Sequence, residues 1–245
     1  MRTVRHSGRV MDLRGVCVIL PALDEADALP VALASFPPGV DLVVVDNGST
    51  DATAAVAVAH GARVVREGRR GFGSACWAGV LATPDAEVVA FADADGSFDG
   101  ADLLAVAGPV LAGDADLVVG SRLRGDRERG AMSRLAVVEN RVLAAACRAL
   151  FGVRVTDLGP FRAIRRDALL GLGIVDRGQG WPLEMIGRAG RAGLRVAEVH
   201  VRYRRRAGGR SKVAGSLPGT IRAVGAMAGV AARLLAERPR LRATG

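Results

Sequence analysis

The sequence has few cysteines, few aromatic residues and no long uncharged apolar run, and each scarcity excludes a class of protein. Its three cysteines, Cys17, Cys76 and Cys147, are odd in number and far apart. This pattern predicts reduced core thiols and argues against a disulfide framework or a cysteine metal site. Aromatic residues make up only 4% of the chain and do not interleave with its basic clusters. We therefore expect no nucleic-acid partner.

No stretch is long enough and free enough of charge to predict a membrane-spanning helix. The apolar run that follows the basic N-terminus is too short for the core of a signal peptide. With reduced cysteines, these features predict a protein of the cytoplasm, either soluble or peripheral to the inner face of the cell membrane. The histidines, His6, His60 and His200, show no metal-ligand spacing.

Acidic residues are outnumbered: 34 Lys and Arg against 25 Asp and Glu give a net charge of +9. The excess lies mostly in the second half, in segments 122–134, 162–166 and 202–212. This field favours an anionic partner, such as a phosphorylated substrate or an anionic membrane surface. Half of the 245 residues are apolar, which is enough for the core of one large α/β domain or two small ones.

The first half alternates short apolar runs with helical segments. Continuous apolar runs predict strands buried on both faces of a parallel sheet. Strands are predicted at 16–20, 41–46, 62–66, 87–92 and 116–120, and helices at 25–36, 50–60, 74–81 and 102–111, with Ser49 or Thr50 as the cap of the second helix. This rhythm predicts a doubly wound α/β sheet, which binds ligands at the carboxyl ends of its strands. Pro21, Asp46 and Asp93 fall at such ends.

The second half is less regular. A polar, mobile loop is predicted at 122–130, helices at 133–150 and 182–192, and an alternating strand at 195–203. The segment 217–237 predicts an amphipathic helix that packs on its own domain or lies on a membrane surface. One face is predicted to carry Ile221, Val224, Met227, Ala228, Ala231 and Leu235, with Arg222 and Arg233 opposite.

Asp93-Ala94-Asp95 follows the apolar run 87–92 and places two carboxylates at a predicted strand terminus. Carboxylates two residues apart can converge where a strand breaks into a turn, and Gly96 allows such a turn. Mg²⁺ and Mn²⁺ bind to one or two carboxylates and complete their shells with water and phosphate oxygens. Taken alone, the motif more often forms a solvated loop that caps a helix.

Four motifs in order carry a resemblance to a known family. They are Pro21-Ala22-Leu23-Asp24-Glu25, Val44-Val45-Asp46-Asn47-Gly48-Ser49-Thr50-Asp51, Arg70-Gly71-Phe72-Gly73-Ser74-Ala75 and Asp93-Ala94-Asp95. Together they resemble family 2 glycosyltransferases of the GT-A fold. Gly120-Ser121-Arg122, the segment 157–162, Glu184 and the segment 206–212 resemble the dolichol- or polyprenyl-phosphate branch.

The resemblance implies one GT-A domain at 16–215, with a Rossmann-like, mostly parallel sheet flanked by helices. It implies a nucleotide-sugar half at 16–120 and an acceptor half at 121–215. A tail at 1–15 precedes the domain, and an amphipathic helix and tail at 216–245 follow it. We leave the oligomeric state open.

The resemblance also implies residue roles. Pro21, Leu23, Glu25 and Asp46 would hold the nucleobase and ribose of a UDP- or GDP-sugar, and Gly71 and Gly73 would permit close backbone approach. Asp95, assisted by Asp93 across Ala94, would bind Mg²⁺ or Mn²⁺ and stabilise the leaving nucleoside diphosphate. Arg206 and Lys212 would bind phosphate, with Arg122 and Arg162 as weaker candidates.

A direct displacement would invert the anomeric centre. Polyprenyl phosphate, the favoured acceptor, is already ionised, whereas a soluble hydroxylated acceptor would need a base, for which Asp157 and Glu184 are candidates. Both also suit structural roles, an ion pair for Asp157 and a cap for Glu184.

The sequence departs from the family pattern at three places. Gly96-Ser97-Phe98 follows the aspartates where the branch often has Gln-His, which leaves the acceptor class open. Asp24 replaces a common Asn, and Asn47 replaces a common Asp, a change that could alter nucleotide preference.

Two interpretations of other classes remain. The glycine-rich segment 71–75, followed by Asp93, resembles the loop of an NAD-dependent oxidoreductase, although it follows the third predicted strand and not the first. A non-catalytic sugar-nucleotide-binding protein would keep the same fold.

Overall fold

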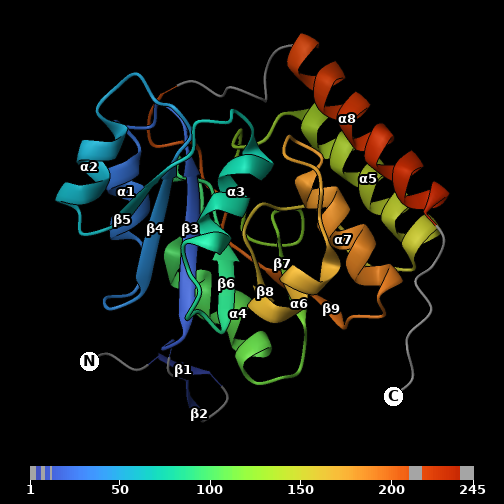
Figure 1. The fold of residues 1–245 in the computed structure, drawn as a ribbon, viewed down its shortest axis with the longest axis horizontal. Coiled ribbons are helices and arrows are strands. Elements are labelled where there is room, and N and C mark those ends of the chain that lie inside the picture. Colours follow the sequence, from blue (N-terminus) through green and yellow to red (C-terminus); the bar gives the residue numbers. More distant parts are fainter. Residues whose placement is uncertain (1–3, 7–8, 12, 210–216, 238–245) are drawn as a thin grey trace.

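The computed structural model describes residues 4–6, 9–11, 13–209 and 217–237. Its centre is a seven-stranded sheet in the order β5-β4-β3-β6-β8-β7-β9 (Figure 1). The strands are β3 (Val16–Ala22), β4 (Asp41–Asp46), β5 (Arg63–Arg66), β6 (Val88–Phe91), β7 (Leu117–Ser121), β8 (Arg162–Arg165) and β9 (Val196–His200). The five strands predicted in the first half are confirmed within about two residues at each end.

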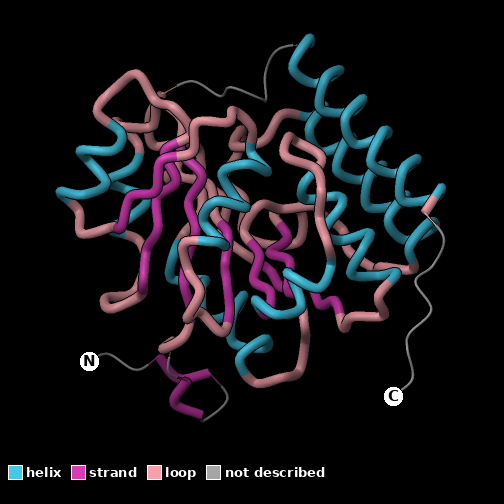
Figure 2. The backbone as a smooth tube through the Cα atoms, viewed as in Figure 1, coloured by secondary structure: helices cyan, strands magenta, loops and turns pink. Residues whose placement is uncertain are grey.

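Helices cover both faces of the sheet, so that three layers form (Figure 2). One face is packed mainly by α1 (Leu29–Ala34) and α4 (Leu103–Leu111), with α2 (Thr53–Ala59) beside α1. The other face is packed by α3 (Phe72–Leu81), α5 (Arg134–Phe151), α6 (Arg166–Leu172), α7 (Trp181–Arg191) and α8 (Leu217–Ala236). The expected α/β fold with a mostly parallel sheet is confirmed.

Strand β3 shows why the apolar runs form buried strands. Cys17 and Ile19 belong to the core beneath α3 and α7, whereas Val16, Val18 and Leu20 belong to the opposite core. Because side chains alternate along a strand, a run that is buried on both faces must be apolar throughout. The strand continues through Pro21 to Ala22, beyond the residue at which it was predicted to end.

Strand β8 and helix α6 are absent from the sequence prediction. β8 is antiparallel to both β6 and β7. Its first residue therefore lies at the edge of the sheet where β6 and β7 end. It has four residues, begins with Arg162 and ends with Arg165, and so has the composition of a polar loop. The antiparallel insertion brings the segment before β8 to the carboxyl ends of β6 and β7.

The N-terminal segment predicted as a tail contains a small antiparallel pair, β1 (Val4–His6) and β2 (Arg9–Met11). Ser49 and Thr50 do not cap α2, whose N-cap is Ala52 and has no side-chain hydrogen bond. Within the described residues, no helix has the length and hydropathy needed to cross a membrane. All three cysteines are free and buried, as predicted.

The predicted face of the last helix is wrong in phase. Val230 and Leu234 of α8 are buried against the core, whereas Leu235 is 56% exposed. Arg233, which was expected on the outer face, reaches the buried Glu184 at 3.2 Å. The described half of α8 therefore packs on α7 of its own domain.

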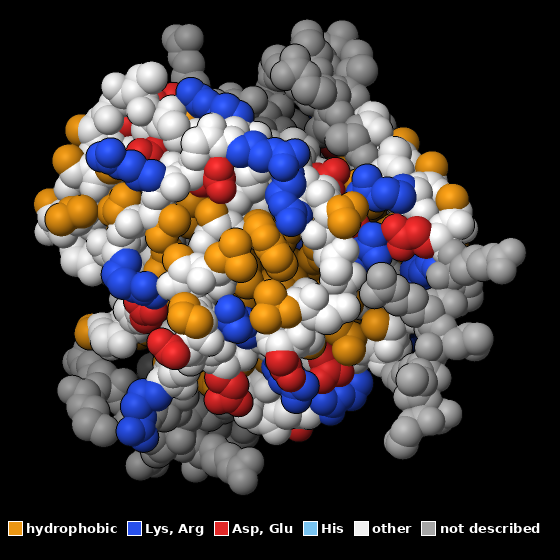
Figure 3. Space-filling model, in the orientation of Figure 1, with side chains coloured by type: hydrophobic (Ala, Val, Ile, Leu, Met, Phe, Trp, Pro, Cys, Tyr) orange, Lys and Arg blue, Asp and Glu red, His pale blue; other side chains and the backbone are white. Residues whose placement is uncertain are grey.

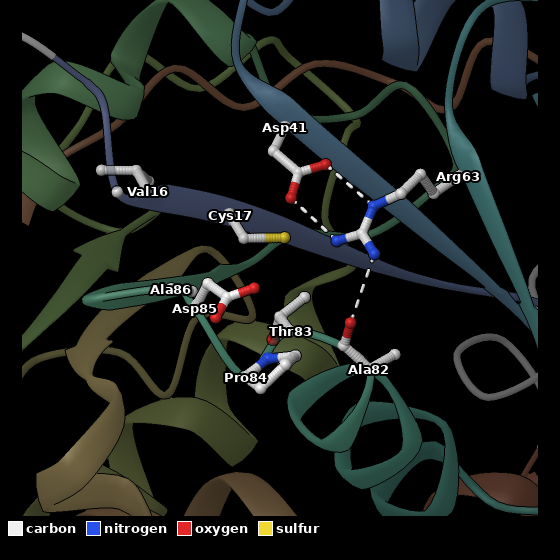
Figure 4. A pocket seen from close by; sticks show the side chains of 10 residues that line it. Val16, Cys17, Asp41, Arg63, Ala82, Thr83, Pro84, Asp85 and Ala86 are labelled. Atoms are coloured by element: carbon white, nitrogen blue, oxygen red, sulfur yellow. Dashed lines mark hydrogen bonds and ion pairs between the residues drawn. The ribbon is translucent and has the colours of Figure 1, made fainter.

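The amino-terminal edge of the sheet holds an open cavity of about 510 Å³ (Figure 4). Arg63 spans its side, because it binds both oxygens of Asp41 and the carbonyl of Ala82. Burial and then Asp41 raise the pKa of the Cys17 thiol to about 12, so the thiol stays protonated and is a poor nucleophile. This cavity lies at the opposite end of the sheet from the residues described next.

Candidate functional site

The loops after β3 and β4 are tied together at the carboxyl edge of the sheet. Asp24 has a positive φ of 47°, a conformation in which Asp and Asn are enriched among non-glycine residues. Its carboxylate accepts hydrogen bonds from the amide and hydroxyl of Thr50, and its own amide donates to Ser49. The amide of Glu25 donates to Thr53. Asp24 thus shapes the loop that carries Pro21, Leu23 and Glu25.

Asp46 ends β4 and is buried to 9% exposure, and its carboxylate accepts a hydrogen bond from the amide of Ser49 at 2.8 Å. The adjacent Asn47 donates to the carbonyls of Glu67 and Arg69 and accepts from the amide of Gly71. An Asp at position 47 would have no N–H to donate to those two carbonyls and would place a carboxylate oxygen against them. The amide therefore has a structural reason at this position, which the sequence did not reveal.

Gly71 and Gly73 allow two backbone segments to approach each other. A Cβ on Gly71 would lie 2.2 Å from the carbonyl oxygen of Arg177, and one on Gly73 would lie 2.8 Å from that of Asp176. The amides of Gly73 and Ser74 donate to this segment. The close approach predicted at these glycines is thus made to the loop before α7 within the protein itself.

Asp93 and Asp95 follow β6 at the centre of the same edge. Asp95 is buried, and its carboxylate accepts from the amide of Ser97. Asp93 is partly buried and forms no hydrogen bond with another described residue. Burial, followed by the charge of Asp95, raises the pKa of Asp93 to about 7. A divalent cation would offset the repulsion between the two carboxylates, so the pair fits Mg²⁺ or Mn²⁺.

Arg206 lies between the nucleotide loops and the aspartates. Its guanidinium donates to Asp95 at 2.8 Å and to both carboxylate oxygens of Glu25 at 2.6 and 2.8 Å. The amide of Ala207 donates to the carbonyl of Asp95. Thus the structure brings together Glu25, Asp95 and Arg206, three residues singled out from the sequence. Within the described residues, no three His, Cys, Asp or Glu side chains gather as a metal cluster.

Asp157 is fully buried and is fully engaged by Arg122. Nε, Nη2 and the backbone amide of Arg122 each donate to it at 2.8 Å. Burial acts to lower the pKa of Arg122, but the hydrogen bonds and charge of Asp157 raise it above its ordinary value. The guanidinium lies 5.3 Å from the ring centre of Tyr203. Of the two roles considered for Asp157, the structure shows the ion pair.

A second layer behind this pair was not predicted. Glu198, on β9, accepts hydrogen bonds from the amides of Thr156 and Asp157 and from the hydroxyl of Thr156. That hydroxyl lies 2.9 Å from the hydroxyl of Ser121. These contacts fix the backbone that presents Asp157 to Arg122. The sequence offered no indication of them, because the partners are about 40 residues apart.

Arg162 is almost fully buried and is held by carbonyl groups. It donates to the carbonyls of Leu158, Gly159 and Pro182. Burial lowers its pKa to about 10. It therefore remains a cation at neutral pH and contributes positive potential on the side of the site that holds Asp93 and Arg122.

Glu184 is fully buried on α7, and its side-chain partners are residues that were not predicted from the sequence to belong to the site. Its carboxylate pairs with Arg188 and Arg233 and accepts from the amides of Val175 and Asp176. These partners belong to α7, α8 and the loop before α7. Glu184 thus joins α7 to α8 through its ion pairs with Arg188 and Arg233. Lys212 lies outside the described residues.

Comparison with known proteins shows the family to which the chain belongs. Residues 17–172 match the family described as Glycosyl transferase family 2. The chain belongs to this family. Family 2 membership argues against the oxidoreductase interpretation, and the chain is a glycosyltransferase.

The relatives of this family 2 glycosyltransferase share most of its length. A glycosyltransferase of Mycobacterium tuberculosis is 48% identical over 85% of this chain and 94% of its own. The polyprenol monophosphomannose synthase of Mycolicibacterium smegmatis is 33% identical over 87% and 84%. A crystal structure of glucosyl-3-phosphoglycerate synthase from M. tuberculosis, in complex with Mn²⁺, UDP and phosphoglyceric acid, matches with a TM-score of 0.71. Its sequence is 27% identical, and the match covers 91% of this chain and 79% of that one.

Proposed function

We propose that the protein transfers a sugar from a nucleoside-diphosphate sugar to polyprenyl phosphate, with inversion at the anomeric carbon and with Mg²⁺ or Mn²⁺ bound by Asp93 and Asp95. The observation that carries the proposal is the carboxylate pair at the carboxyl end of β6, the partly buried Asp93 and the buried Asp95, with Arg206 bound to Asp95. Such a cation would neutralise the diphosphate and stabilise the departing nucleoside diphosphate. The loops around Leu23 and Asp46 would hold the base and ribose.

The state of the two candidate bases favours a phosphate acceptor. A hydroxyl acceptor needs a group to take its proton, but Asp157 and Glu184 are buried and engaged by arginines. A phosphate acceptor brings its own negative charge and needs cations. Arg162, buried on the side of the site formed by β8, would add positive potential there, and Arg122, which is paired with Asp157, would add less. The relative from Mycolicibacterium smegmatis, a polyprenol monophosphomannose synthase, supports the same choice.

Arg206 is proposed to change partners when the substrates bind. In the free protein Arg206 neutralises Glu25 and Asp95. A divalent cation bound to Asp95 would compete with Arg206 for that carboxylate. Once a cation and the diphosphate are bound, its guanidinium can fork two phosphate oxygens. We expect Arg206→Gln to bind Mn²⁺ alone more tightly than the native protein and to lose most of its transfer rate. Equal Mn²⁺ affinity in a calorimetric titration would contradict the first half of this expectation.

The test of function is a transfer assay that crosses donors with acceptors. UDP-glucose, UDP-N-acetylglucosamine and GDP-mannose are each offered with polyprenyl phosphate in detergent, with 3-phosphoglycerate or with a neutral sugar, in Mn²⁺ or in EDTA. We expect a metal-dependent lipid product with one donor, lost in Asp95→Asn. Asp85→Asn, at an exposed carboxylate beside the distant cavity, should be as active as the native protein. Transfer only to 3-phosphoglycerate or a neutral sugar would refute the lipid acceptor.

A further inference from the structure

Helix α5 is apolar on two opposite faces. Its inward face carries Ala144, Cys147 and Phe151, which are buried in the core. Its outward face carries a row at heptad spacing whose members are all exposed: Leu135, Val138, Val142, Ala145 and Ala149. Leu135, Val138 and Val142 are 54, 55 and 62% exposed. A helix on the surface of a soluble domain normally turns polar residues outward.

Arginines border this outward row along one side. Arg134, Arg141 and Arg148 recur every seven residues and are all exposed. Among the described residues, none of the three forms an ion pair with an acid. The helix itself contains one acid, Glu139, which lies beyond the other side of the apolar row. A stripe of apolar side chains beside a row of cations is typical of a helix that lies in the plane of an anionic membrane surface.

The apolar surface continues onto α8. Both helices pack on α7, and Leu234 of α8 and Phe151 of α5 both come close to Gly187. The exposed positions described on α8 are also uncharged: Gly225, Ala228, Gly229, Ala232, Leu235 and Ala236. In the space-filling view, apolar side chains follow the edge of the molecule where these helices lie (Figure 3).

We propose that the outward face of α5 docks the enzyme on an anionic lipid membrane. A second copy of the chain fits this face less well, because it would offer one acid on α5 to three arginines. The same helix also reaches the proposed acceptor side of the site, since Asn140 on its inward half accepts a hydrogen bond from Arg122 at 3.2 Å. A membrane against the outer face of α5 would lie one helix away from Arg122. The proposal rests on the proposed lipid acceptor, for which such a position is needed.

Vesicle co-sedimentation tests the docking face. The native protein is expected to bind vesicles of phosphatidylcholine mixed with phosphatidylglycerol and to bind pure phosphatidylcholine far less. Val138→Gln/Val142→Gln should weaken binding at least roughly tenfold, because two side chains lose insertion. The triple change of Arg134, Arg141 and Arg148 to Gln should weaken it by roughly a hundredfold, at about fivefold for each arginine. These exposed changes should leave the melting temperature unaltered.

A matched control changes two equally exposed apolar residues elsewhere. Val58→Gln/Leu81→Gln, at sites 63 and 59% exposed on α2 and α3, should bind as the native protein does. Absence of binding by the native protein, or an equal loss in this control, would overturn the proposal. It would also fall if the α5 variants bound vesicles normally but changed from dimer to monomer in light scattering.

The transfer assay in detergent separates this proposal from the function. Transfer to polyprenyl phosphate without vesicle binding would reject the docking face and keep the function. Vesicle binding through α5 without transfer to polyprenyl phosphate would reject the proposed function and keep the docking face.

Discussion

Removal of the Asp157 carboxylate should destabilise the fold, because Asp157 is the buried partner of Arg122. In Asp157→Ala, the buried guanidinium of Arg122 loses the group that accepts its hydrogen bonds from Nε and Nη2, and its backbone amide loses a third. Removing one member of a buried ion pair costs about 3 to 5 kcal/mol. For a chain of this length, each kcal/mol lowers the melting temperature by about 2 to 4 °C. The expected loss is therefore roughly 6 to 20 °C.

The assay is urea unfolding followed by circular dichroism, with a melting curve as a second reading. Asp167→Ala is the control, because its ion pair with Arg165 is exposed, and exposed pairs contribute about 0 to 1 kcal/mol. The double change Arg122→Leu/Asp157→Leu should be less destabilised than the sum of the two single changes, since it leaves no unpaired buried charge.

Two results would refute this reasoning. The first is an Asp157→Ala protein within 1 kcal/mol of the native one, which would show that the pair is not needed for the fold. The second is an Asp157→Asn protein of native stability whose transfer rate has lost its acid limb in a pH profile. That result would return Asp157 to the role of general base.

Three further predictions concern the glycine loop, the last helix and the aspartate pair. Gly71→Ala should cost more than about 2 kcal/mol in unfolding free energy, because its φ is 140° and its Cβ would meet a carbonyl; Gly68→Ala, with open space around it, should cost under about 1 kcal/mol. Leu234→Ala should cost about 2 to 5 kcal/mol and Leu235→Ala under about 0.5 kcal/mol, and equal melting temperatures for the two would contradict the packing of α8. The pKa of Asp93 is raised to about 7, so below that pH the carboxyl holds a proton that Mn²⁺ must displace. The affinity for Mn²⁺ should therefore fall by up to about tenfold per pH unit below 7. Equal Mn²⁺ affinities in calorimetric titrations from about pH 6 to 8 would exclude this competition.

The sequence was sufficient for the elements whose burial is uniform. Runs such as 16–20 are apolar because both faces of the strand are covered, so they can be recognised without knowledge of the fold. β8 was missed because arginines begin and end it. The α8 face was misplaced because apolar residues occur on more than one side of that helix, and periodicity then cannot choose the buried one.

The candidate site was predictable only as a set of residue types. Asp93 and Asp95 are only two residues apart in sequence, so their convergence at the end of a strand could be expected. The contacts of Arg206 with Asp95 and Glu25 span 111 and 181 residues, and no local pattern encodes them. The same holds for the carboxylate of Asp157, whose partner could be named only once the fold joined β7 to the segment before β8.

The antiparallel course of β8 has a consequence for how such enzymes diversify. β7 and β8 are neighbours, and the amide of Gly120 donates to the carbonyl of Phe161 at 2.8 Å. The excursion from 122 to 160, which includes α5, therefore departs from and returns to one point on the sheet. Its inner side is tied to the core by Ala144, Cys147 and Phe151, but its exposed side can change without shifting the register of any strand. Substitutions there can alter acceptor and surface preference while the donor loops after β3 and β4 stay intact.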